Sequence, residues 1–391
     1  MSPNQPRLRL FNYFAVEAIC AFAGILFLYC AFFWTKKKFG YSPTENLLLT
    51  ATHGFTYIFA SKYGGRIADR WGYDRMLSLC SLGLAAVLLL GWIPDWRWTP
   101  FVVVALFTLF IGPVWPSLEA AVLHCPGSTS MPNRLGFYNI TWASGDALGF
   151  AVSALFFKWN PDSILWIAGL FYLVKWLWLQ LGSRHSSTEG EVAMDMPHSG
   201  DDVPREVKRR FMHTAWMANG LGFLMLAGLV ALTPQIGESL GLSEEMTIWL
   251  TSSQLFARAA SFAICWKWEG WHYHRGWSLG ALWLAPVSLA AAFFIHNSAV
   301  VFVSLAIFGL AHGLSYSGSL YYSLDYGENK GEHGGLHEAI LGIGIFVGPL
   351  LAALVSSRNG GTFGAQWTIV GLPILFNFVV LKWLAQMKHA R

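Results

Sequence analysis

Two charged side chains lie deep inside long apolar stretches of the sequence. Asp146 stands near the middle of an apolar stretch over residues 134–157, and Arg258 stands well inside another over residues 244–267. A carboxylate can carry a proton, and a guanidinium can bind an anionic group. Charges in apolar surroundings are costly, so they mark functional sites. We expect the two residues to handle a solute or a proton; the alternative is a static ion pair that fixes packing.

Further polar residues in apolar stretches extend this set of candidates. Glu17 lies inside residues 10–34 and could take up a proton, while His312 lies in the middle of residues 299–322. Gln254 precedes Arg258 by one helical turn and shares its face. For the histidine, a buried ring with satisfied hydrogen bonds is the commoner alternative. We predict that Glu17, Gln254 and His312 bind a solute or couple its movement to a proton.

One helical face combines polar, aromatic and small residues. Asn139, Trp142, Asp146 and Gly149 follow one another at spacings of three and four, which places them on one face of a helix. This stripe is our best candidate for the lining of a solute pathway.

Small residues four positions apart let helices approach closely. Gly145 with Gly149 and Gly344 with Gly348 have this spacing, and Pro349 could kink the second helix. We expect these residues to form helix-packing faces.

Several other chemistries find no support in the sequence. Its five cysteines form no CxxC pair, which argues against a disulfide framework or a zinc site. His333, His337 and Glu338 have the spacing of a helical metal site, but no further strong ligands accompany them. No phosphate-binding loop, dinucleotide fingerprint or nucleophile elbow is present. We therefore predict no metal, no cofactor and no enzymatic activity, and we disfavour an ATP-driven pump.

The elements that would position these residues are membrane-spanning helices. Of 391 residues, 54% are hydrophobic and 12% are charged, whereas soluble domains carry about 25% charged residues. A spanning helix needs roughly 20 apolar residues. Twelve stretches qualify, at residues 10–34, 44–64, 76–93, 99–123, 134–157, 163–182, 211–234, 244–267, 277–295, 299–322, 335–356 and 364–386.

The spans fall into two sets of six. A polar segment over residues 183–208 separates an expected bundle of residues 1–182 from a second one of residues 209–391. Most of the 26 Lys and Arg residues fall on the side of this linker and of both termini, which predicts that this side is cytoplasmic. Lys36, Lys37 and Lys38 on the other side fit this rule poorly. The net charge of +4 is not gathered in one run, so nucleic acid is not an expected partner.

The two halves resemble each other in sequence. At an offset of 200 positions, one residue set repeats: Trp71, Tyr73 and Arg75 correspond to Trp271, Tyr273 and Arg275. Six helices per half give both halves the same orientation in the membrane. The pattern indicates a duplication with parallel repeats.

The loop after the second span carries a recognisable motif. Residues 65–75 read GRIADRWGYDR and resemble the signature loop G-x-x-x-D-R/K-x-G-R-R/K of the major facilitator superfamily, at the place where that family has it. Gly65, Asp69, Arg70 and Gly72 match. Residues 73 and 74 depart from the usual basic pair, and Arg75 restores one positive charge.

The resemblance implies an all-α membrane protein with 12 transmembrane helices in two pseudo-symmetric six-helix bundles. It also implies that Asp69 accepts hydrogen bonds from a helix N-terminus in the other half, and so holds one conformation; the alternative is a basic loop that only fixes topology. In this family the helices of Asp146 and Arg258 face each other across a central cavity. Exporters of the family carry a GxxxGP pattern in the fifth helix, which here lacks the proline.

The function that the resemblance implies is secondary active transport. We expect a monomer in the plasma membrane that moves a small polar or anionic solute by alternating access, coupled to protons. Efflux of lipophilic compounds is the alternative within transport. A membrane sensor or assembly scaffold that no longer transports is the alternative outside it.

Overall fold

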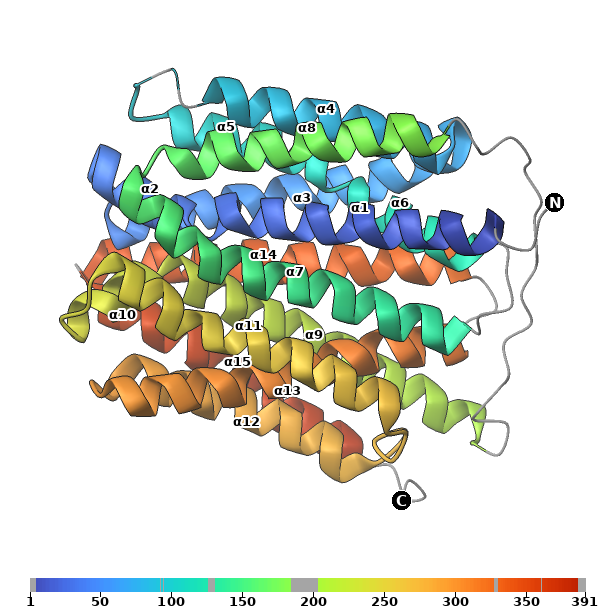
Figure 1. The fold of residues 1–391 in the computed structure, drawn as a ribbon. Coiled ribbons are helices and arrows are strands. Elements are labelled where there is room, and N and C mark those ends of the chain that lie inside the picture. Colours follow the sequence, from blue (N-terminus) through green and yellow to red (C-terminus); the bar gives the residue numbers. More distant parts are fainter. Residues whose placement is uncertain are drawn as a thin grey trace. The chain divides into compact units, whose positions relative to one another are not determined.

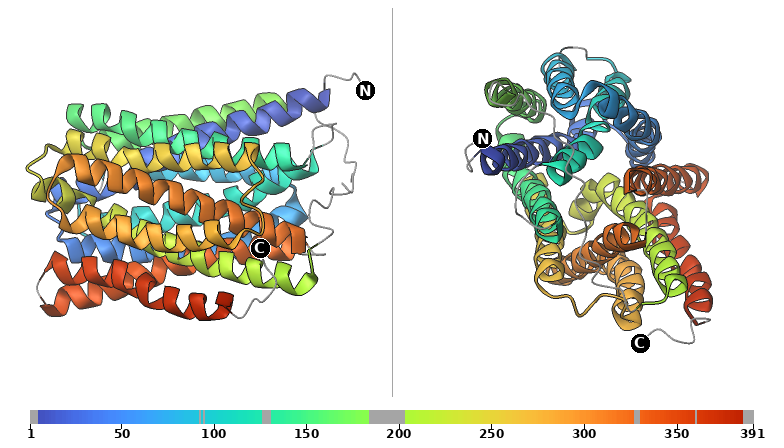
Figure 2. Two further views of the ribbon diagram at one scale, coloured as in Figure 1. Left: turned by 90° about the horizontal axis from the view of Figure 1, so that it is seen from below. Right: turned by 90° about the vertical axis from the view of Figure 1, so that its right-hand side faces the viewer.

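The structure is a computed structural model. It describes residues 5–91, 93, 95–125, 131–183, 203–326, 330–359 and 361–385, and all regular secondary structure in them is helical (Figure 1). Within these residues the chain packs as two compact units. The first takes in residues 5–31 and 59–183, and the second takes in residues 32–58 and 203–385. Seen end-on in Figure 2, the helices within each unit run roughly parallel or antiparallel to one another.

The helices of the N-terminal part are α1 (Gln5–Leu28), α2 (Ala31–Phe39), α3 (Pro43–Trp71), α4 (Tyr73–Gly91), α5 (Thr99–Ile111), α6 (Val114–His124), α7 (Met131–Trp159) and α8 (Ser163–Ser183). In the first unit, α1 packs on α7 and α8, and α4 packs on α8. Helix α3 passes from the second unit to the first between Ile58 and Phe59.

The helices of the C-terminal part are α9 (Arg205–Ala231), α10 (Thr233–Ser239), α11 (Glu244–Lys267), α12 (Arg275–Phe294), α13 (Ser298–Tyr326), α14 (Lys330–Asn359) and α15 (Thr362–Ala385). Helix α13 packs on α11 and α12, and α14 packs on α9. An aromatic and aliphatic core that includes Phe211, Trp271 and Tyr322 joins α9, α12 and α13.

Two of the predicted spans are interrupted at prolines. Residues 99–123 form α5 and α6, which meet at Gly112 and Pro113. Proline removes a backbone donor and clashes with the preceding turn. The glycine beside it lets α3 pack closely, because a Cβ on Gly112 would come within 2.7 Å of Ala60 Cβ. The span predicted from residue 211 continues into α10 after a break at Leu232, just before Pro234. Residues 10–34 are also divided, into α1 and α2, although no proline lies at that break.

The helices have the character of membrane spans. Ten segments among the described residues are long and apolar enough to cross a membrane, so the chain is an all-α, multi-pass integral membrane protein. Helices α3 and α11 are long enough but more polar, because they carry buried hydroxyl, amide and charged side chains. Polar spans in a bundle face protein or water-filled space, so twelve spans are consistent with this fold.

The C-terminal end of the expected linker is helical in the structure. Residues 205–208 already form the first turn of α9, which has Pro204 as its N-cap. Proline is well placed at a helix start because its missing donor needs no partner there. Residues 184–202 lie outside the described part of the chain. The expected division into halves at this linker stays a prediction, whereas packing groups residues 32–58 with the second unit.

Lys36, Lys37 and Lys38, which fit the distribution of basic residues poorly, lie in α2, close to acidic residues of α10 and α11. Lys37 Nζ lies 2.8 Å from Glu244 Oε2 at the start of α11, and Lys36 forms an ion pair with Glu238 in α10. The acidic residues explain how three adjacent lysines are tolerated at this end of the helices.

Candidate functional site

Three of the predicted binding residues gather on α11 and α13 in the second unit. Gln254 and Arg258 are each 2% exposed and His312 is 1% exposed. Arg258 lies close enough to His312 to act on it electrostatically. Neither ring nitrogen of His312, nor Oε1 of Gln254, has a hydrogen-bond partner among the described residues. Buried polar atoms almost always find partners, so these atoms have hydrogen-bonding capacity left over.

Close packing holds this cluster in place. Glycines of α13 allow the approach, because a Cβ on Gly309 would clash with the Gln254 carbonyl and one on Gly313 would lie 2.6 Å from Ser261 Cβ. The His312 ring stacks on Phe308 and meets Phe223 edge to face, with ring centroids 5.8 and 4.8 Å apart. The polar groups are therefore rigidly presented within apolar walls.

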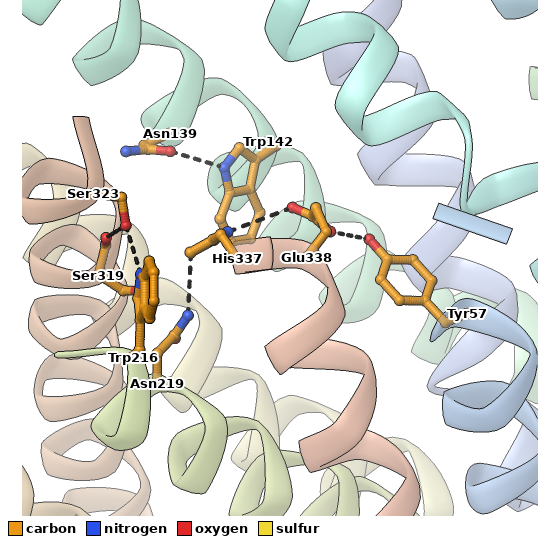
Figure 3. Close-up of polar contacts among 9 residues, drawn as sticks. All are labelled: Tyr57, Asn139, Trp142, Trp216, Asn219, Ser319, Ser323, His337 and Glu338. Atoms are coloured by element: carbon orange, nitrogen blue, oxygen red, sulfur yellow. Dashed lines mark hydrogen bonds and ion pairs between the residues drawn. The ribbon is translucent and has the colours of Figure 1, made fainter. Parts of the chain in front are cut away.

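Helix α7 carries the predicted stripe in the first unit. Asn139 and Trp142 are buried, and the indole Nε1 of Trp142 donates to Asn139 Oδ1 over 3.3 Å (Figure 3). Asp146 is half-buried and lies within electrostatic reach of Tyr172 on α8. Asp146 and Arg258 belong to different units, so their pairing stays a prediction.

The predicted small residues of α7 lie against α1. A Cβ on Gly145 would come within 2.9 Å of Ala21 Cβ, and one on Gly149 within 2.7 Å of Ile25 Cγ2. Larger side chains at either glycine would push the two helices apart.

Glu17 lies in the interior of the first unit together with a residue not proposed as a site from the sequence, Lys175. Both side chains are fully buried. Neither the two carboxylate oxygens of Glu17 nor Lys175 Nζ has a hydrogen-bond partner among the described residues. Lys175 Nζ lies 5.7 Å from the centroid of the Tyr172 ring. Two orphaned charges in one small core are unusual enough to require a role or a compensating partner.

A buried polar chain in the second unit includes His337 and Glu338, whose spacing in the sequence suggested only a metal site. The Tyr57 hydroxyl on α3 donates to Glu338 Oε2 on α14 in a short hydrogen bond. Glu338 Oε1 lies 3.7 Å from His337 Nδ1, and His337 Nε2 lies 3.2 Å from Asn219 Nδ2 on α9. Figure 3 shows Tyr57, Glu338, His337 and Asn219 in this order. No group of three metal-ligating side chains was found in the described part of the chain.

Helix α14 is held closely on two sides. On one side, Gly344 and Gly348 face α9, where a Cβ on either would clash with Gly220 or Leu224. On the other, Gly342 would meet Ile58 Cγ1 of α3 at 2.8 Å. Pro349 lies inside α14, which continues through it.

The signature loop connects α3 and α4 through a single residue. Gly72 has a φ of 92°, a conformation that glycine adopts readily and other residues rarely. Asp69 is exposed and accepts a hydrogen bond from the Tyr73 hydroxyl over 3.1 Å. Tyrosine at position 73, a departure from the family pattern, thus gives the aspartate a partner within its own loop. Gly65 makes ordinary contact with Pro116 of α6, at 3.7 Å.

The remaining basic positions of this loop, Arg70 and Arg75, are exposed. The neighbouring acid, Asp74, is tied to α1: it accepts a hydrogen bond from the Tyr13 hydroxyl over 2.8 Å and lies 3.7 Å from the Arg9 guanidinium.

The corresponding loop of the second unit is fastened by a different network. Asp325 at the end of α13 lies 3.0 Å from Lys208 Nζ and accepts a short hydrogen bond from the Tyr273 hydroxyl. Burial and the Asp325 carboxylate raise the pKa of Tyr273 well above its usual range, which keeps the phenol a donor. The His272 ring stacks on Tyr321 with centroids 3.9 Å apart. The loop over residues 268–274 is therefore clamped to α9 and α13.

Comparisons with known proteins agree with this architecture. The family model described as Major Facilitator Superfamily matches residues 13–257. A mutant of the nucleoside transporter NupG has a TM-score of 0.75 at 11% identity, with 96% of this chain and 99% of the other covered. A bacterial homolog of the human lysosomal transporter Spinster, in an inward-facing and unoccupied conformation, has a TM-score of 0.74 at 13% identity, with 98% and 96% covered. No curated protein sequence matches the chain.

The family match covers more than half of the chain, so the protein belongs to the major facilitator superfamily. It is a membrane transporter of that fold. The identities of 11–13% to the solved structures establish the fold alone.

Proposed function

We propose that the protein is a secondary active transporter of a small polar or anionic solute. Its two six-helix halves expose the solute site to one side of the membrane and then to the other, and this movement is coupled to protons. The observation that carries this proposal is the buried cluster of Gln254, Arg258 and His312, in which polar atoms of the glutamine and the histidine lack hydrogen-bond partners among the described residues. Sites in such transporters lie near the bilayer midplane, where polar groups are costly unless they serve a solute.

The cluster has the chemistry of an anion or polar-group site. Arg258 supplies a planar, permanently charged fork of donors. His312 offers a donor and an acceptor on its two ring nitrogens, and Gln254 offers an amide. Such a set favours a carboxylate, a phosphate or a hydrogen-bonding heterocycle over a lipophilic cation, which is why we prefer polar solutes to lipophilic efflux substrates.

The membrane arrangement is part of the proposal. We place both termini and the linker of residues 183–208 in the cytoplasm of a cell whose plasma membrane holds the protein as a monomer. The bias of basic residues toward this side supports the orientation.

A thermal-shift screen of the purified protein against carboxylates, phosphorylated compounds, sugars, amino acids and nucleosides would test the substrate class. A ligand that binds only the folded state raises the melting temperature. The best solute is then assayed for uptake into proteoliposomes with and without a proton gradient. Concentration of the solute only with the gradient is the expected result.

The matched variants are Arg258→Gln and, as a control, Arg97→Gln at an exposed position between α4 and α5. Losing charge-assisted hydrogen bonds to an anionic group should weaken solute binding about tenfold or more. The control should bind like the wild type. A solute that shifts the melting temperature of Arg258→Gln as much as that of the wild type would rule out this cluster as its site.

A further inference from the structure

The contact between α3 and α14 in the second unit is tight enough to exclude any extra atom. A Cβ on Gly54 would clash with the Phe346 backbone, and one on Gly342 would lie 2.8 Å from Ile58 Cγ1. Phe55 packs on Phe346 with ring centroids 5.5 Å apart. At the far end of this seam, Thr44 Oγ1 donates to Ser356 Oγ over 3.0 Å.

A buried carboxyl group lies on this seam. Glu338 is 6% exposed, and it accepts the Tyr57 hydroxyl across the seam while its other oxygen faces His337 Nδ1 at 3.7 Å. The imidazole in turn contacts Asn219 through Nε2. In Figure 3 these side chains form a continuous chain from α3 through α14 to α9.

We propose that Glu338, with His337 as its proton-exchange partner, is a proton-binding site whose occupancy controls the α3–α14 contact through Tyr57. This proposal rests on the proposed function, since it names the proton site of the transport cycle. It assigns that role to residues outside the Gln254–Arg258–His312 cluster.

The proton balance is simple. With Glu338 ionised, Tyr57 donates a charge-assisted hydrogen bond to the carboxylate, and these are roughly twice as strong as neutral ones. A proton that arrives on the imidazole passes from Nδ1 to Glu338 Oε1 and leaves the ring neutral again. The carboxylic acid then accepts from Tyr57 only as a neutral group, so the link between the helices weakens. No covalent bond other than those to the transferred proton changes.

The groups that face the site come from three other helices. From α3 the facing titratable groups are Tyr57 and the buried His53, whose ring centroid lies 5.9 Å from that of Tyr57. From α13 the facing group is Tyr316, whose ring meets His337 edge to face at 5.2 Å, and from α9 it is the neutral Asn219.

The contact itself can be measured without any solute. Thr44→Cys with Ser356→Cys places two thiols at the end of the seam, where the native hydroxyl oxygens are 3.0 Å apart. The extent of oxidative cross-linking in nanodiscs, set against pH, reports closure of the α3–α14 contact. The cross-linking yield at each pH is corrected by the reactivity of a variant that carries only one of the two cysteines, because thiol reactivity itself rises with pH. Glu338→Gln mimics the protonated acid, and Tyr57→Phe removes the donor.

In the parent pair, cross-linking should fall several-fold as acid protonates Glu338. Glu338→Gln should be low at every pH, and Tyr57→Phe should be low at high pH, whereas Tyr63→Phe, an exposed position of the same helix, should behave like the parent. His337→Gln should slow the response to a pH jump. Infrared difference spectra recorded between high and low pH should show a protonated-carboxyl band in the parent, and this band should be absent in Glu338→Gln.

An unchanged pH response in Glu338→Gln would overturn the proposal, as would equal effects of Tyr57→Phe and Tyr63→Phe. If Glu338→Gln does not fold, Glu338→Asp is the test variant, because its shorter side chain draws the carboxylate away from Tyr57. The pH dependence of cross-linking should then shift, and an unchanged pH dependence would contradict the proposal. Because no solute is present, a negative result here is separate from failure of the substrate screen.

Discussion

Tyr172 on α8 donates a hydrogen bond to the backbone carbonyl of Cys20 on α1 over 3.3 Å. The two helices run in opposite directions (Figure 1). Three residues further along α8 and three residues back along α1 therefore lead to Lys175 and Glu17 at a similar depth. Electrostatic contacts connect the two side chains through cysteines: Lys175 and Cys20 both lie within reach of Cys80, and Glu17 lies within reach of Cys20 and of Glu119.

We predict that Glu17 and Lys175 compensate each other's charge in the core of the first unit. Glu17→Gln or Lys175→Met alone should lower the free energy of unfolding by about 1–3 kcal/mol, measured as a fall in melting temperature. This cost is smaller than that of removing one partner from an ion pair in direct contact. The double variant should regain most of the loss. Lys158→Met, at an exposed position of α7, is the matched control. Simply additive losses in the double variant would show that the two charges act independently.

The clamp on the second loop gives a stability prediction. Asp325 is 5% exposed and Lys208 is 13% exposed, so Lys208→Met leaves a nearly buried carboxylate without its cation and should cost about 3 kcal/mol. Tyr273→Phe should cost less, since one hydrogen bond is lost. Thermal unfolding in detergent measures both, and Lys62→Met at an exposed position of α3 should change nothing. Equal stability of Lys208→Met and Lys62→Met would contradict the clamp.

The signature loop should act on a conformational equilibrium. Asp69→Asn should insert normally but transport less, because losing a charge-assisted hydrogen bond costs roughly 1.5–3 kcal/mol, enough to shift a balanced equilibrium about tenfold. Accessibility of engineered cysteines on each membrane face measures the shift. Tyr73→Phe removes the donor seen in the structure and should have a smaller effect in the same direction. If Asp69→Asn leaves accessibility and transport unchanged, the loop has only a topological role.

We predict that Asp146 and Arg258 form an ion pair. If the pair is structural, the double variant Asp146→Asn with Arg258→Gln should recover both folding and transport, while each single change is impaired. If the pair serves coupling, the double variant should fold and exchange solute but fail to concentrate it. Proteoliposome uptake and counterflow separate these outcomes. Full transport in both single variants would remove either role.

The orientation is testable independently of transport. Reporter fusions at the C-terminus and within residues 183–208 should both report a cytoplasmic location, because most basic residues lie on that side. A periplasmic signal from either fusion would reverse the topology.

Sequence periodicity predicted which segments are helices because lipid demands long apolar runs whose backbone groups bond internally. The signature motif also placed Gly72 in the loop between the second and third spans. Periodicity did not single out Tyr57, Glu338 and His337 as one site, since a spacing along one helix does not say which neighbour faces it. The adjacent His337 and Glu338 at the start of an apolar stretch were the available signal. Nor did periodicity single out Lys175, whose neighbours include Cys80 on α4 and Tyr172 on its own helix.

The ion pairs of α2 make the packing of this helix sensitive to the salt concentration around the protein. Lys37 and Glu244 keep 47% and 41% of their side-chain surface exposed, so dissolved ions reach them. At 0.15 M salt the Debye length is about 8 Å, and it grows to about 30 Å at 0.01 M. The attraction that joins α2 to α10 and α11 therefore strengthens in dilute surroundings. The ionic strength of the solution on that side of the membrane therefore tunes this contact between helices without any change in the protein.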